Sequence, residues 1–130
     1  MRADATLSHT YDSQIWPATP PAAPVATYLA DAQLRYRWLA FDLDASRAGV
    51  EAVATDCRRL TAVLDQLGID YLVCSSGPSD GRHVWVRLTK HAAAADVKEM
   101  ARTLARALPS LDVSPLVNPG TGCVRIPGSP

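Results

Sequence analysis

The chain has 130 residues with 13 basic and 13 acidic side chains, so its formal net charge is zero. This length suits one domain, and the balanced charge argues against a protein that binds nucleic acid mainly by bulk phosphate neutralisation. There is no apolar run of about 18 residues and no apolar signal region at the N-terminus, which argues against a membrane-spanning helix and against secretion. Three widely spaced cysteines without a C-x-x-C pair are typical of reduced thiols in a cytoplasmic protein.

The ten prolines are unevenly distributed along the chain. Four lie within residues 17–24 and five within residues 109–130, so the regular elements are expected between these segments. Residues 1–35 are predicted to form a proline-rich N-terminal extension in extended or polyproline conformation, anchored to the core by Ile15 and Trp16. Residues 36–130 are predicted to form the folded domain.

The first regular elements predicted are a strand and a helix. Apolar residues alternate along Tyr36–Asp44 (YRWLAFDLD), which predicts a strand with Asp42 and Asp44 on the face opposite the apolar side chains. Apolar residues then recur at three- and four-residue steps over Ala48–Leu67, which predicts an amphipathic helix. The predicted N-cap and C-terminal stop of this helix are Ser46 and Gly68.

The second half of the chain is predicted to contain a hairpin, a helix and short strands. Ile69–Ser75 and His83–Thr89 alternate in the same way and are separated by a short glycine-containing loop, so they are expected to pair. Asp96–Leu108 is predicted to form the core of a second helix, which the following proline ends. Residues 111–114 and 123–126 are expected to be short strands.

The order β-α-β-β-α-β predicts an α+β fold with an RRM-like, or ferredoxin-like, sheet and both helices on one face. The other face would carry Asp42, Asp44, His83, Trp85 and Arg87, with Asp112 at its flank. Converging carboxylates repel one another unless a cation is present, and oxygen ligands suit Mg²⁺ or Mn²⁺. The sequence therefore predicts a divalent metal site that acts on a phosphorylated substrate.

The loop of the predicted hairpin is a second candidate feature. The segments Ser75-Ser76-Gly77 and Gly81-Arg82-His83 are suited to cradle a phosphate through backbone N–H groups and hydroxyls. Each feature alone has a plainer explanation, such as a solvated strand end, an ordinary glycine hairpin loop, a packing histidine or a surface arginine. Their combination on one sheet face favours a functional site.

These residues resemble a known family. Asp42-Leu43-Asp44, the segment from Ser76 to His83, and Asp112 resemble, in order and spacing, the three motifs of archaeo-eukaryotic primase-type (primase-polymerase) catalytic domains. The ending Asn118–Pro130 (NPGTGCVRIPGSP) resembles the segment that follows the third motif in plasmid- and phage-type members. The resemblance covers roughly residues 36 to 130, and the composition suggests an actinobacterial source.

The resemblance implies a role for each motif residue. The catalytic residues would be Asp42, Asp44, Asp112 and His83, with the three carboxylates as ligands of Mg²⁺ or Mn²⁺. Residues that would contact the nucleotide are Ser75, Ser76, Gly77, Arg82, His83 and Arg125. The implied function is a cytoplasmic nucleotidyltransferase that binds an NTP or dNTP and makes or extends a primer on a single-stranded DNA template in plasmid or phage replication. Candidate partners outside this chain are C-terminal helicase or DNA-binding domains.

Two alternatives stay open at this point. The first is a non-catalytic RRM-like module that binds nucleic acid or nucleotide, for which Trp85 would be a stacking residue. The second is a catalytically incomplete primase fragment that binds nucleotide without polymerising it. RNA or DNA synthesis, template preference and oligomeric state are not predicted by any feature of the sequence.

Overall fold

A computed structural model describes residue 19 and residues 22–129. In chain order its elements are β1 (Ala26–Tyr28), β2 (Arg35–Leu43), α1 (Ala45–Ala48), α2 (Val50–Gln66), β3 (Tyr71–Ser75), β4 (Arg82–Ala93), α3 (Ala94–Ala105), β5 (Leu111–Asp112), α4 (Ser114–Val117) and β6 (Cys123–Arg125). The predicted anchor residues Ile15 and Trp16 lie outside the described residues. Within the described ranges, no helix is both long and apolar enough to cross a membrane.

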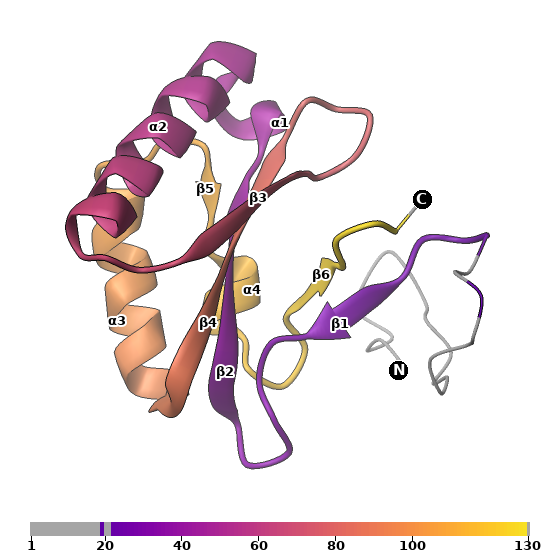
Figure 1. Ribbon diagram of the computed structural model, residues 1–130, viewed down its shortest axis with the longest axis vertical. Helices are drawn as coiled ribbons and strands as arrows, with labels where there is room; N and C mark the ends of the chain where they lie inside the picture. The colour runs from indigo at the N-terminus through magenta and orange to yellow at the C-terminus, as the bar shows by residue number, and fades with distance from the viewer. Residues whose placement is uncertain (1–18, 20–21, 130) are drawn as a thin grey trace.

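Four strands form an antiparallel sheet in the order β3-β4-β2-β5. Helices α2 and α3 lie along one face of this sheet, and a small sheet of β1 and β6 lies on its other side (Figure 1). The α+β class predicted from the sequence is confirmed, and the elements of the larger sheet follow one another as β2-α2-β3-β4-α3-β5. The two central strands, β2 and β4, therefore decide which side chains face the helices and which face the β1–β6 sheet.

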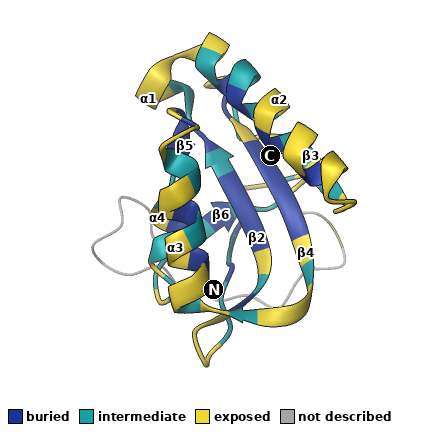
Figure 2. Cartoon of the chain, turned by 90° about the vertical axis from the view of Figure 1, so that its left-hand side faces the viewer, coloured by how far each residue is buried: buried dark blue, intermediate teal, exposed yellow. Residues whose placement is uncertain are grey.

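The apolar core lies between the sheet and the two long helices. Alternate residues of the central strands are buried there, and Figure 2 shows this burial along β2 and β4, with exposed residues on the outer sides of the helices. The core residues from these four elements are Leu39, Phe41, Leu43, Val84, Val86, Val53, Leu60, Leu64, Val97 and Ala101. Burying one large apolar side chain stabilises the fold by about 1.5–3 kcal/mol, so this layer fixes the orientation of both strands.

The first predicted helix is interrupted at Gly49, whose φ of 89° is in the region that favours glycine. The interruption separates α1 from α2, so the long helix begins at Val50, later than predicted. The prediction of Ser46 as N-cap is wrong: Asp44 caps α1, and its carboxylate accepts a hydrogen bond from the Ser46 N–H. Gly68, with a φ of 64°, follows the helix end as predicted.

The last predicted strands are shorter than expected and belong to different sheets. β5 ends at Asp112, because Ser114 already begins the short helix α4. β6 pairs with β1, with Ala26 opposite Arg125, although β1 lies inside the predicted N-terminal extension. Leu29, from the same segment, is only 3% exposed. Residues from the predicted extension thus pack with the folded domain, and the proposed division of the chain at residue 36 stays a prediction.

Candidate functional site

The central strands bring Asp42 and His83 together. The two residues are partners in the β2–β4 register, and Nε2 of His83 lies 3.4 Å from Oδ1 of Asp42. On the other side of β2, Asp42 is the register partner of Asp112 on β5. Since cross-strand partners project from the same face, the Asp42 carboxylate stands between an imidazole and a second carboxylate. The His83 side chain is 6% exposed and that of Asp42 is 25% exposed, so the pair is only partly open to solvent.

The other two predicted metal ligands are each held by a serine two residues further along the chain. The Asp44 carboxylate accepts hydrogen bonds from the N–H and the hydroxyl of Ser46, both at 2.8 Å. Oδ1 of Asp112 accepts from the N–H of Ser114 at 2.9 Å and from its hydroxyl at 2.7 Å. Such local bonds turn each carboxylate towards its own backbone. In the part of the chain that the structure describes, no three His, Cys, Asp or Glu side chains therefore form a group that could hold a metal ion.

The chemistry of these acidic side chains nevertheless fits a divalent cation. Asp44 follows Asp42 by two residues in extended conformation, so both belong to one face, and Asp112 is the neighbour of Asp42 across the strands. Carboxylate oxygens are the ligands that Mg²⁺ and Mn²⁺ prefer. A carboxylate has about four acceptor sites, so the bonds from the serines leave oxygen positions for a cation.

A buried hydrogen-bond network supports this end of the sheet from the helix side. Asp56 of α2 is 1% exposed, and its Oδ2 accepts from the N–H of Ser110 at 2.9 Å and from its hydroxyl at 2.7 Å. The carbonyl oxygen of Ser110 in turn accepts from the N–H of Asp44 at 2.8 Å. Ser110 thereby links α2 to the ends of β2 and β5, where Asp44 and Asp112 lie. This support was not predicted, because a single aspartate on a helix is usually solvated.

The β3–β4 loop closes tightly around two glycines. The N–H of Ser76 donates to the carbonyl oxygen of Gly81 at 3.0 Å. A Cβ at Gly81 would collide with the Ser76 hydroxyl and would lie 3.0 Å from the carbonyl oxygen of Leu43, so this position needs glycine. At Gly77, whose φ is 136°, a Cβ would lie 3.2 Å from Nη1 of Arg125. The guanidinium group of Arg125 thus lies against the loop predicted to bind phosphate.

Two of the predicted nucleotide contacts, Arg82 and Ser75, are directed away from the face that carries Asp42 or are bonded within the loop. Arg82 precedes His83 on β4 and so projects from the opposite face, towards α2. Its charge acts on Cys57 of α2: burial raises the pKa of the Cys57 thiol, and Arg82 partly offsets this. The hydroxyl of Ser75 donates to the carbonyl oxygen of Gly77 at 3.2 Å, within the loop itself. The structure therefore brings together Asp42, His83 and Asp112, but it does not place Arg82 on their face.

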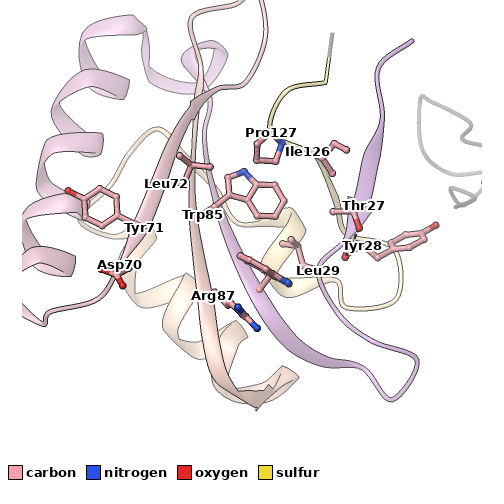
Figure 3. Close-up of a pocket in the computed structure, with 11 residues that line it drawn as sticks. Thr27, Tyr28, Leu29, Asp70, Tyr71, Leu72, Trp85, Arg87, Ile126 and Pro127 are labelled. Carbon is pink, nitrogen blue, oxygen red and sulfur yellow. Dashed lines mark hydrogen bonds between the residues drawn. The ribbon is translucent and has the colours of Figure 1, made fainter. Parts of the chain in front are cut away.

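A groove that the sequence did not predict lies further along the face that carries Asp42. It has a volume of about 440 Å³ and lies between the larger sheet and the β1–β6 side (Figure 3). Trp38 and Trp85 line it, with ring centroids 6.5 Å apart in an edge-on arrangement, and the guanidinium carbon of Arg87 lies 5.9 Å from the centroid of Trp38. The available signal was the alternation along the strand, because Trp38 lies four positions before Asp42 and therefore on the same face.

Comparison with known proteins identifies the family. The family model described as the primase-polymerase domain of LigD matches residues 7–116. This chain belongs to the LigD primase-polymerase domain family. The matched region contains Asp42, His83 and Asp112 and ends before Arg125. The resemblance to primase-polymerase domains seen in the sequence is thereby confirmed. The actinobacterial source, and the plasmid or phage type, stay predictions.

A solved structure supports the same fold. The polymerase domain of Mycobacterium tuberculosis ligase D, solved in complex with DNA, matches with a TM-score of 0.56 and 20% sequence identity. The match covers 82% of this chain and 45% of that one, so this member of the LigD family spans less than half the length of its structural neighbour. At this identity the likeness concerns the fold. No protein of curated function matches the sequence.

Proposed function

We propose that this chain is an RRM-like catalytic core of a metal-dependent nucleotidyltransferase. It would bind an NTP or dNTP and make or extend a primer on a single-stranded DNA template in plasmid or phage replication. The observation that carries this proposal is the position of Asp42, in register with His83 on one side and with Asp112 on the other. Membership of the LigD primase-polymerase family supports the type of reaction. A DNA partner is supported by the neighbour solved with DNA.

The acidic end of the sheet would hold the metal. Asp42, Asp44 and Asp112 would be the ligands of Mg²⁺ or Mn²⁺, which when bound neutralises phosphate charge and stabilises the attacking and leaving oxygens of an in-line displacement. Asp42 would remain oriented by His83, whose Nε2 is already directed at its carboxylate. The bonds of Ser46 and Ser114 would limit the rotation of the other two carboxylates. These side chains would supply position and charge, the main requirements of phosphoryl transfer.

The triphosphate of the nucleotide would lie beside the β3–β4 loop. Gly77 lets the backbone approach closely, and the guanidinium of Arg125 lies next to it from a different strand. Arginine presents paired N–H donors that match phosphate oxygens. His83 and Ser76 border the same region, His83 as the partner of Asp42 and Ser76 through its bond to Gly81. The proposed nucleotide site thus combines β4, β6 and the loop.

Primer synthesis and nucleotide binding test the proposal together. Wild type and the variant Asp42→Ala with Asp44→Ala would be measured with Mn²⁺ on single-stranded DNA. A matched control removes two carboxylates from α3, Asp96→Ala with Glu99→Ala, on the other side of the sheet. We expect product and metal-dependent nucleotide binding from wild type and control, and neither from the site variant.

Other results would select the alternatives. Nucleotide or nucleic-acid binding that needs no metal and survives the loss of both carboxylates would contradict the catalytic site and indicate a binding module. Metal-dependent binding without product in wild type would indicate an incomplete fragment of a larger polymerase.

A further inference from the structure

The face that carries Asp42 is organised in successive rows across the strands. The row containing Asp42 and His83 is followed by one in which Trp85 stands opposite Ala40, and then by one in which Arg87 stands opposite Trp38. Two residues along a strand advance about 7 Å. The indole of Trp85 therefore begins one step, and that of Trp38 two steps, from the proposed metal and phosphate site.

The groove over these rows is apolar on its floor and open. Trp38 is 44% exposed and Leu72, the register partner of Trp85 on β3, is 54% exposed, so two large apolar side chains are open to solvent along this one groove. Ile126 and Pro127 line the opposite side (Figure 3). These two residues directly follow Arg125, so one short segment contacts the phosphate loop and also lines the groove.

One polar atom at the groove is unpaired. Trp85 is 7% exposed, and its Nε1 has no hydrogen-bond partner among the described residues. An indole N–H can only donate, and a buried donor without an acceptor is unfavourable. A ligand that enters beside Trp85 with an acceptor at its edge would relieve this, after a small shift of the groups that cover the nitrogen.

We propose that this groove is the subsite for the nucleobase of the nucleotide whose phosphates lie at Asp42 and Arg125. The inference rests on the proposed function and adds where the base is held. A nucleobase is planar and so can stack on the exposed ring of Trp38, and it carries carbonyl oxygens and ring nitrogens that can accept from Trp85. Arg87 would add a cation over the stacked rings. The continuity through Arg125 and Ile126 favours the bound nucleotide over a template base as the occupant.

The test compares ligands with and without a base. Dissociation constants for dGTP, inorganic tripolyphosphate and deoxyguanosine would be measured by calorimetry in the presence of Mn²⁺. For Trp38→Ala we expect about tenfold weaker binding of dGTP and unchanged binding of tripolyphosphate, because only the base contact is lost. Trp85→Phe, which keeps a ring but removes the N–H, should also weaken the binding of dGTP and leave the binding of tripolyphosphate unchanged. Leu34→Ala, at a 48% exposed apolar residue outside the groove, is the control and should change neither.

The outcomes separate the two proposals. Unchanged dGTP binding in both tryptophan variants, or equal weakening of dGTP and tripolyphosphate, would overturn the base subsite. Loss of affinity for a single-stranded oligonucleotide, with dGTP unaffected, would also overturn it and assign the groove to the template. Binding of deoxyguanosine that depends on Trp38, in a chain that binds no tripolyphosphate, would support the base subsite and contradict the proposed metal and phosphate site.

Discussion

Asp42 and Asp112 are register partners on adjacent strands, so two carboxylates project side by side from one sheet face. Like charges directly opposite each other destabilise a strand pair, by an amount of the order of 0.2–1 kcal/mol. The two carboxylates together therefore lower the stability of the metal-free fold, and a cation bound between them would turn this repulsion into attraction. A change in stability on adding metal thus distinguishes a metal-binding role of Asp112 from a purely structural one.

Asp112→Asn should therefore stabilise the metal-free protein and remove its response to metal. We expect the free energy of unfolding in urea to rise by about 0.5 kcal/mol without divalent cations, because the repulsion is lost while the amide oxygen still accepts from Ser114. Wild type should gain stability from Mn²⁺ and the variant should not. Asp96→Asn, on α3, is the control. Equal stabilisation of wild type and Asp112→Asn by Mn²⁺ would exclude Asp112 as a ligand.

Asp44 has two separable tasks, since it caps α1 and is a proposed metal ligand. Asp44→Ala should lower the free energy of unfolding by about 1 kcal/mol, because the Ser46 N–H loses its acceptor. Asp44→Asn should keep most of that stability, since an asparagine oxygen also caps a helix. Both variants should bind Mn²⁺ more weakly than wild type. If Asp44→Asn binds Mn²⁺ as wild type does, Asp44 is a cap and no more.

Gly81 is the position in the β3–β4 loop where a side chain does not fit. Gly81→Ala should destabilise the protein by about 1–3 kcal/mol, since the new methyl group would press on the Ser76 hydroxyl and on the Leu43 carbonyl. Gly120→Ala is the matched control, because a Cβ there meets nothing within 4 Å. Chemical denaturation of both variants measures the difference. Similar midpoints would show that the loop can open without cost.

Tyr36 makes the stability of the folded protein fall with rising pH in the alkaline range. Its side chain is fully buried, and its hydroxyl donates to the carbonyl oxygen of Leu116 at 3.0 Å. Burial raises the pKa of Tyr36 to about 12, above its ordinary value of 10.0. The folded state holds this proton more tightly than the unfolded state, so its contribution is complete below pH 10 and is lost as the pH rises towards 12.

Tyr36→Phe tests this dependence. At pH 7 the variant should be less stable by about 1 kcal/mol, because a buried hydrogen bond is missing. Between pH 10 and pH 12 the stability of wild type should fall more steeply, and the gap between the two proteins should narrow. Urea unfolding at a series of pH values provides the measurement. Parallel profiles would mean that Tyr36 ionises equally in both states.

Local patterns were sufficient to predict the central elements and the face on which the acidic residues lie. The alternation along β2 and β4 is strong because one face packs on helices, and this put Asp42 and His83 on the other face. The same alternation should have excluded Arg82 from that face, since it immediately precedes His83. Arg82 was predicted to contact phosphate because it is an arginine beside a glycine loop, although its position on the strand places it on the other face.

Features that depend on distant pairing were not predicted. β1 has three residues and forms because β6, almost a hundred positions later, offers it a partner. The groove exists for the same reason, since Ile126 and the strand β1 come from opposite ends of the chain. The break at Gly49 was missed because the apolar stripe of the predicted helix begins at Val50 and gives no information on α1, which has no buried residue. The backbone angle of Gly49 separates the two helices.

Ser110 uses its N–H, its hydroxyl and its carbonyl oxygen at once, the first two on Asp56 and the third on Asp44. Positions 56 and 110 are consequently not free to vary independently. Replacing Asp56 by an apolar residue leaves the two buried donors of Ser110 without their acceptor. A second change at position 110 removes only the hydroxyl, unless the new residue is proline, which has no backbone N–H. Genetic suppressors of a lesion at position 56 should therefore restore an acceptor nearby, and they are expected within α2 or in the segment that precedes β5.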